Sequence, residues 1–153
     1  MAVTRFLGAI LLSASAFSVP VSLGAQVAVP AMAHNQENIL HLDLSTGGRV
    51  SILLRPEVAP NHVARIKELA RRGFYNNVTF HRVIEGFMAQ TGDPTGTGMG
   101  DSDLPDLKAE FNDTPHMRGT VSMARTADPD SANSQFFICF MPRYDLDNKY
   151  TVF

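Results

Sequence analysis

Short segments in which apolar and polar residues alternate recur along this chain, and they restrict it to folds built largely from β-strands. Residues 38–44 and 50–54 alternate on either side of the Gly-rich turn 45–48. Two such segments around a turn predict a β-hairpin. Later apolar segments predict short strands at residues 79–84, 87–90, 120–124 and 135–140, and residues 149–153 begin another.

One segment has helical rather than alternating periodicity. In residues 61–72, Val63, Ile66 and Leu69 form an apolar stripe at helical spacing. Pro60 suits the first turn of a helix and Gly73 suits the position just past its end. Many short strands with one intervening helix indicate a small barrel or sandwich.

The N-terminal segment, residues 1–33, differs from the rest. Arg5 is its only charged residue, residues 6–12 are apolar, and a small-x-small cleavage site ends at Ala33. This order predicts a cleaved secretory signal, with cleavage after Ala33 or, alternatively, after Ala25. An uncleaved membrane anchor is the other interpretation, but serine and proline interrupt the apolar run short of the ~20 residues that a spanning helix needs.

Cleavage after Ala33 leaves one domain at residues 34–153, and we expect it to be exported, in a bacterium to the periplasm. The chain has 13 Lys and Arg against 15 Asp and Glu, a net charge of −2, so it lacks the basic surface typical of nucleic-acid binding. Its hydrophobic fraction of 44% excludes disorder through low hydropathy. The single cysteine, Cys139, excludes an intramolecular disulfide and a cysteine-rich zinc site.

Common catalytic motifs are missing from the sequence. The Gly-rich segment 92–100 lacks the Gly-Lys-Ser/Thr ending of a phosphate loop, so we interpret it as a structural loop. The five histidines are scattered without metal-binding spacing, and His81 is expected to be a packed, hydrogen-bonded residue. No serine lies in a Gly-x-Ser-x-Gly elbow. Cys139 lies in an apolar run and is expected to be buried and unreactive.

Several polar residues instead lie at the edges of apolar strands. Arg82 lies among Phe80, Val83 and Ile84, and the others are Gln90, Arg125 and Gln135. Together they indicate an apolar groove with a few fixed hydrogen-bond donors, which is how sites for extended peptides are built.

Four segments carry a resemblance to a known family. Residues 80–93, FHRVIEGFMAQTGD, match the pattern F-H-R-V-I-x-G-F-M-x-Q-x-G-D of the cyclophilin-type peptidyl-prolyl isomerases throughout. Residues 119–124, 133–138 and 146–153 are similar to the family's G-x-[VL]-S-M-A, S-Q-F-F-I and L-D-[GN]-K-x-x-V-F-G segments. The resemblance implies an antiparallel, eight-stranded β-barrel capped by helices, and catalysis of cis/trans rotation about X-Pro bonds in folding proteins, without a metal or cofactor.

The resemblance also implies which residues form the site. Arg82 has the catalytic role, in which its guanidinium donates hydrogen bonds to the twisted amide. The substrate-binding positions are Phe87, Met88, Phe137 and Leu146 for the proline ring, Gln90 and Gln135 for the peptide backbone, Ala124 and Arg125 along the strand edge, and Tyr150. In the family the position of Arg125 is often occupied by Asn, and the position of Tyr150 is often occupied by His. The implied partners are proline-containing peptides and unfolded or folding proteins.

Two departures from the family pattern lead to further expectations. Asp145 stands where many eukaryotic members have a Trp that is associated with cyclosporin binding, so we expect weak cyclosporin affinity. The family pattern continues beyond Phe153 with a second helix and a final strand, so we expect a C-terminally incomplete barrel with unpaired strand edges. Two alternatives to the enzyme stay open, namely a non-catalytic peptide-binding or chaperone module, and a truncated fragment that does not fold alone.

Overall fold

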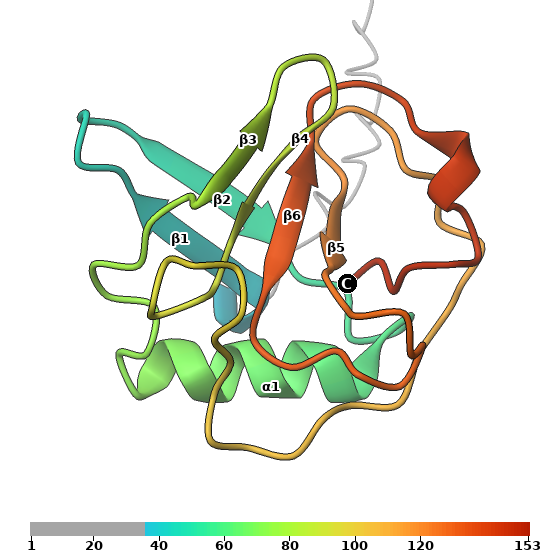
Figure 1. Ribbon diagram of the computed structural model, residues 1–153, viewed down its shortest axis with the longest axis horizontal. Helices are drawn as coiled ribbons and strands as arrows, with labels where there is room; N and C mark the ends of the chain where they lie inside the picture. Colours follow the sequence, from blue (N-terminus) through green and yellow to red (C-terminus); the bar gives the residue numbers. More distant parts are fainter. Residues whose placement is uncertain (1–35) are drawn as a thin grey trace, which may run out of the picture. The chain divides into compact units, whose positions relative to one another are not determined.

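The computed structural model describes residues 36–153 and contains two antiparallel sheets and one α-helix (Figure 1). The predicted export signal at residues 1–33 lies outside the described residues. No helix in the described part is long and apolar enough to cross a membrane. The elements are η1 (Gln36–Asn38), β1 (Ile39–Asp43), β2 (Arg49–Leu53), α1 (Pro60–Arg71), β3 (Arg82–Ile84), β4 (Met88–Thr91), β5 (Val121–Met123), β6 (Phe136–Cys139) and η2 (Tyr144–Leu146).

Strands β1 and β2 form the predicted hairpin. Leu40 pairs with Ile52 and Leu42 with Val50, so the alternating apolar residues share one face. The turn closes through Leu44, whose N–H donates to the Gly48 carbonyl at 3.0 Å. Gly47 and Gly48 have φ angles of 82° and 113°, which a residue with a Cβ rarely adopts.

Helix α1 begins and ends within one residue of the predicted bounds. Its N-terminus is held by Glu110, whose carboxylate accepts the backbone N–H groups of Asn61 and His62, each at 3.1 Å. A carboxylate is favourable there because the first N–H groups of a helix have no partner within the helix. Past the C-terminus Gly73 takes a φ of 72° and donates to the Ala70 carbonyl, as a helix-terminating glycine does.

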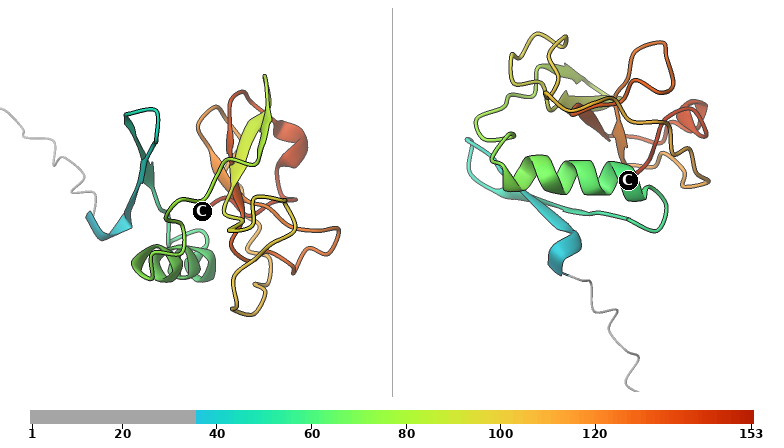
Figure 2. Two further views of the ribbon diagram at one scale, coloured as in Figure 1. Left: turned by 60° about the vertical axis from the view of Figure 1, so that its left-hand side comes forward. Right: turned by 90° about the horizontal axis from the view of Figure 1, so that it is seen from below.

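The second sheet has the strand order β3-β4-β6-β5. In Figure 2 the hairpin and this sheet form separate layers, and α1 lies along one side of the space between them. The main core fills that space and joins side chains from β2, α1, β5 and β6 with the end of the chain. It includes Ile52, Val63, Ile66, Val121, Met123, Phe136 and Phe153.

The mainly β, antiparallel class is confirmed, whereas the described residues do not form a closed eight-stranded barrel. No strand of the hairpin pairs with a strand of the four-stranded sheet. The two are joined through the main core. In addition, Arg55, just after β2, donates its N–H to the carbonyl of Phe153 at the end of the chain, at 2.6 Å. The strand expected at residues 149–153 is reduced to one bridge, between Val152 and Ser122. Backbone hydrogen bonds to β5 extend only one residue to either side of that bridge, which is too short for a strand.

Gly92 allows two backbone segments to cross directly after β4. A Cβ at this position would lie 2.4 Å from the Ser134 carbonyl oxygen and 2.8 Å from Gln135 Cα, and the φ of Gly92 is 94°. We expect Gly92→Ala to lower the free energy of unfolding by roughly 3 kcal/mol, because backbone strain and a backbone clash add. Urea unfolding followed by circular dichroism measures this loss.

The matched control is Gly47→Ala. Gly47 has a similar φ of 82° but no atom within 4 Å of a Cβ placed there. This variant isolates the conformational strain, for which we expect about 1 kcal/mol. Equal losses in the two variants would contradict the steric role of the Gly92 crossing.

Candidate active site

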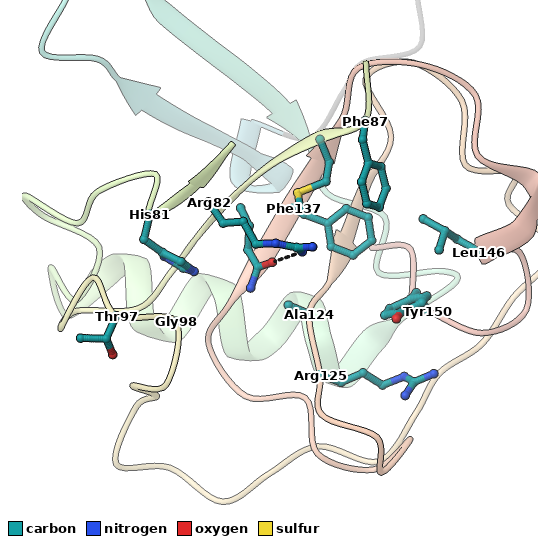
Figure 3. Close-up of a pocket in the computed structure, with 12 residues that line it drawn as sticks. His81, Arg82, Phe87, Thr97, Gly98, Ala124, Arg125, Phe137, Leu146 and Tyr150 are labelled. Carbon is teal, nitrogen blue, oxygen red and sulfur yellow. Dashed lines mark hydrogen bonds between the residues drawn. The ribbon is translucent and has the colours of Figure 1, made fainter. Parts of the chain in front are cut away.

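A cavity of about 430 Å³ opens on the face of the four-stranded sheet that is turned away from the main core (Figure 3). Of the predicted site residues, all except Gln135 line this cavity. Its walls come from β3 and β4, the end of β5, β6, η2 and the loop that follows β4. The lining residues are His81, Arg82, Phe87, Met88, Gln90, Thr97, Gly98, Ala124, Arg125, Phe137, Leu146 and Tyr150.

The turn between β3 and β4 determines where Arg82 lies. The Phe87 N–H donates to the Ile84 carbonyl at 3.0 Å, and Gly86 takes a φ of 66°. The resulting register places Arg82 directly opposite Gln90, so both side chains lie on one face of the sheet. Arg82 Nη1 donates to Gln90 Oε1 at 3.3 Å, and the guanidinium extends toward Phe137 (Figure 3). Arg82 therefore presents an exposed cation at the edge of the cavity.

The apolar part of the site is a small second core beside the cavity. Met88, Phe137, Cys139 and Leu146 are buried together, and Phe87, Ala124 and Tyr150 pack against them. The rings of Phe137 and Tyr150 meet edge to face, with centroids 5.7 Å apart. This cluster forms an apolar wall of the cavity, against which a small ring can pack.

A series of polar side chains, buried at His116 and Ser122 and half-buried at Asp147, supports Phe137. The His116 ring stacks on the Phe137 ring, with centroids 6.3 Å apart and 14° between their planes. His116 Nδ1 lies 2.8 Å from Asp147 Oδ1, and its Nε2 lies 3.0 Å from Ser122 Oγ. The backbone N–H and the ring of His116 both hydrogen-bond to Asp147 and lower the pKa of its carboxyl.

This Asp147–His116–Ser122 arrangement has the connectivity of a hydrolytic triad, but Ser122 is fully buried. A serine that no substrate can reach does not act as a nucleophile. His116 stacks on Phe137 and is hydrogen-bonded to Asp147, which directly follows Leu146. These contacts fix two walls of the cavity, Phe137 and Leu146, relative to each other.

Two arginines stack on aromatic rings that line the cavity. The guanidinium of Arg125 lies 4.6 Å from the centroid of Tyr150 and donates to the Lys149 carbonyl. The guanidinium of Arg143 lies 3.8 Å from the centroid of Phe87. Arg143 also binds Asp145 through two hydrogen bonds, of 2.8 and 2.7 Å, and thereby lowers the pKa of that carboxyl. An ion pair thus occupies the rim of the cavity beside Phe87.

Gln135 lies behind the cavity. Its Oε1 accepts a hydrogen bond from Gln90 Nε2 at 2.9 Å, and its own Nε2 donates to the carbonyls of Gly98 and Gly100 at 3.2 and 2.9 Å. Gln135 therefore connects Gln90 to the loop that follows β4.

Sequence reasoning missed His81, Thr97 and Gly98, which also line the cavity. The expectation that His81 is hydrogen-bonded is wrong, because both of its ring nitrogens are shielded and have no partner among the described residues. Thr97 and Gly98 reach the cavity through the loop after β4. An Asp two residues after a strand, followed by threonines and glycines that can donate to it, is the signal that could have indicated this loop.

Cys139 is buried as predicted, and burial raises the pKa of its thiol. Within residues 36–153 no group of three or more His, Cys, Asp or Glu side chains is arranged to hold a metal ion.

The model of the family described as "Cyclophilin type peptidyl-prolyl cis-trans isomerase/CLD" matches residues 41–153 of this chain. The chain belongs to this family. A relative from Brucella suis biovar 1 (strain 1330), named "Probable peptidyl-prolyl cis-trans isomerase", is 50% identical over 152 residues, which cover 92% of this chain and 76% of the relative. Peptidyl-prolyl cis-trans isomerase B of Bacillus subtilis (strain 168) is 44% identical over 72% of this chain and 77% of its own length.

Solved cyclophilin structures share the fold. A Cryptosporidium parvum cyclophilin type isomerase, crystallised in the presence of the dipeptide Ala-Pro, has a TM-score of 0.71 and 30% identity over 75% of each chain. Cyclophilin AquaCyp293 from Hirschia baltica has a TM-score of 0.68 and 32% identity over 76% of this chain and 62% of its own. The cyclophilin identity read from the four sequence segments is confirmed.

Proposed function

We propose that this protein is a peptidyl-prolyl cis-trans isomerase that accelerates rotation about X-Pro bonds in folding proteins. The observation that carries the proposal is the position of Arg82, a guanidinium held by Gln90 at the edge of a cavity walled by Phe87, Met88 and Phe137. Membership of the cyclophilin family supports the same reaction.

The reaction needs binding groups and no nucleophile, because no covalent bond is broken. Amide resonance opposes the rotation with a barrier of about 18–20 kcal/mol. An enzyme lowers this barrier by binding the twisted amide more tightly than either planar form. When the amide twists, conjugation is lost and the prolyl nitrogen becomes a better hydrogen-bond acceptor. A guanidinium can donate to this nitrogen or hold the neighbouring carbonyl, and it keeps its charge at every relevant pH.

In this proposal the proline ring lies against Phe87, Met88, Phe137 and Leu146, which hold it still while the preceding residue rotates. Arg82 donates to the twisted amide from the open side of the cavity. The peptide backbone runs along the edge formed by Ala124 and Arg125, near Tyr150, and bonds to the Gln90 amide. Gln135 acts through Gln90, because its amide hydrogens already donate to Gly98 and Gly100.

Removing the guanidinium tests the mechanism. We expect Arg82→Ala to lower kcat/KM by roughly 10²- to 10³-fold, because one preorganised donor to the transition state is lost. Arg49→Ala, which removes an exposed arginine paired with Asp43 in the hairpin, is the matched control and keeps the wild-type rate. The rate of cis-to-trans exchange in a proline-containing peptide, followed by NMR, measures both.

The two parts of the proposal fail in different ways. A folded wild-type protein that is no faster than the uncatalysed background contradicts the enzyme assignment and leaves a peptide-binding module. An active protein whose rate is insensitive to Arg82→Ala contradicts the role given to Arg82 alone.

Cyclosporin affinity tests the rim of the cavity. Asp145 is held by Arg143 and presents a carboxylate where many eukaryotic members present an indole, so we propose weak cyclosporin binding. We expect Asp145→Trp to tighten binding by roughly tenfold, equivalent to about 1.4 kcal/mol of added apolar contact and hydrogen bonding. Asp103→Trp, at an exposed aspartate that pairs with Arg72, serves as the control. Tight inhibition of the wild-type protein in a cyclosporin titration would overturn this expectation.

We also propose that residues 1–33 are an export signal and that residues 34–153 act outside the cytoplasm, in the periplasm of a bacterium. The basis is the order of a positive start, an apolar segment and a small-residue cleavage site. N-terminal sequencing of the protein recovered from the cell envelope is expected to begin at His34, or at Gln26 if cleavage follows Ala25. Recovery of the uncleaved chain from the cytoplasm alone would contradict export.

A further inference from the structure

Asp93, two residues after the end of β4, is a fully buried carboxylate outside the cavity lining. It accepts five hydrogen bonds, all from neutral groups. Its Oδ1 accepts the N–H and the hydroxyl of Thr95, both at 2.7 Å. Its Oδ2 accepts the N–H groups of Thr97 and Gly98 at 3.0 and 2.6 Å, and the Thr97 hydroxyl at 3.4 Å. The loop that follows β4 is therefore folded around one carboxylate.

The space around this carboxylate is closely filled. A Cβ at Gly100 would lie 2.2 Å from Asp93 Oδ1. Burial by itself raises the pKa of Asp93, but the hydrogen bonds from Thr95 and Gly98 outweigh burial and hold the pKa well below its usual range. The ionised form, which only accepts hydrogen bonds, is the form that matches this set of donors.

The loop held by Asp93 determines which way Gln135 faces. The carbonyls of Gly98 and Gly100 both accept from Gln135 Nε2, so the NH₂ end of this amide must point at the loop. Its oxygen then faces Gln90 and accepts from Gln90 Nε2. A flipped Gln135 amide would place an oxygen against two carbonyl oxygens and an NH₂ group against that of Gln90.

The fixed orientation of the Gln135 amide also determines which group of Gln90 faces Arg82. Because the NH₂ end of Gln90 is directed to Gln135, its Oε1 is the end presented to Arg82, and it accepts from Arg82 Nη1 at 3.3 Å. Hydrogen-bond direction is thus fixed along one continuous path from the loop carbonyls to the guanidinium. Without that direction, Gln90 could present its NH₂ end, which repels a guanidinium.

We propose that Asp93 is a positioning residue for the isomerase, one that sets the orientation of Arg82 through the loop carbonyls, Gln135 and Gln90. This inference rests on the function proposed above. Asp93 touches neither the substrate nor Arg82, and its effect is on how the guanidinium is held before the peptide arrives.

The direct test is Asp93→Asn, which keeps the shape of the side chain but replaces an acceptor by a donor that faces backbone N–H groups. We expect kcat to fall by roughly 10- to 100-fold, as for a small misplacement of a catalytic group. KM for the peptide is expected to change less than kcat, because the apolar walls that hold the proline ring are unchanged. We also expect the side-chain ¹⁵N resonances of Arg82 to shift in the NMR spectrum of the free protein.

A double-variant cycle separates positioning from general destabilisation. In an Arg82→Ala background, Asp93→Asn is expected to cause no further loss of kcat, because the group that it positions is already missing. An equal loss in both backgrounds, or wild-type kcat with an unshifted Arg82 resonance, would overturn the proposal.

Glu110→Gln is the matched control. Glu110 also accepts two backbone N–H groups, but at the start of α1 and without a connection to the cavity. This variant is expected to lower stability while the kcat of the folded protein and the Arg82 resonances stay unchanged.

If Asp93→Asn does not fold, Thr95→Val provides a milder perturbation, since it removes one hydroxyl donor to Asp93 and leaves the carboxylate in place. The expected loss of kcat is then about two- to fivefold, again absent in the Arg82→Ala background. The Arg82 resonance also keeps the two proposals apart, because it reports the position of the guanidinium even in a folded protein that shows no isomerase activity.

Discussion

The pairing of β4 with β6 is the constraint on which both the core and the site depend. Gln90 lies opposite Phe137 and Met88 opposite Cys139 in this ladder. Because side chains alternate between the two faces of a strand, Phe136 enters the main core and Phe137 enters the cavity cluster. A register slip of one residue would exchange these faces and destroy both at once.

The polar groups behind the cavity follow from the same sheet. Ser122 of β5 lies opposite Phe137 of β6, so the hydroxyl that bonds His116 is on the cavity side of the sheet, while its neighbours Val121 and Met123 face the main core. A hydrogen-bonded series of this kind, with His116 and Ser122 fully buried, rigidifies the residues that it contacts, because a rearrangement would leave a buried polar group without a partner. The apolar wall of the site is therefore held by polar contacts that a substrate never meets.

Much of this arrangement could be predicted from the sequence, because it depends on local patterns. The alternation of apolar and polar residues correctly predicted the hairpin, and helical spacing predicted the bounds of α1 to within one residue. The polar residues at strand edges, such as Arg82 and Gln90, line one cavity, as their pattern indicated. What could not be predicted depends on contacts between distant segments. Thr97 reaches the cavity because a loop folds around Asp93, and His116 reaches Phe137 because η2 brings Asp147 to it. Residues 149–153 have the pattern of a strand, but pairing rather than pattern makes one, and only Val152 forms a bridge.

The demands of the reaction explain why one exposed side chain, Arg82, is connected to a series of hydrogen bonds that begins in the interior of the protein. β3 is a three-residue edge strand with no buried residue, so the sheet itself does little to restrain Arg82. A free arginine side chain carries about 2 kcal/mol of rotamer entropy, and ordering it only in the transition state would cost up to roughly 30-fold in rate. Rotation about the amide bond needs no nucleophile, metal or proton transfer. The scaffold therefore contributes to catalysis by ordering the guanidinium before the peptide binds. The path from Asp93 through Gln135 and Gln90 supplies that order from the rigid interior of the sheet, where β4 and β6 pair.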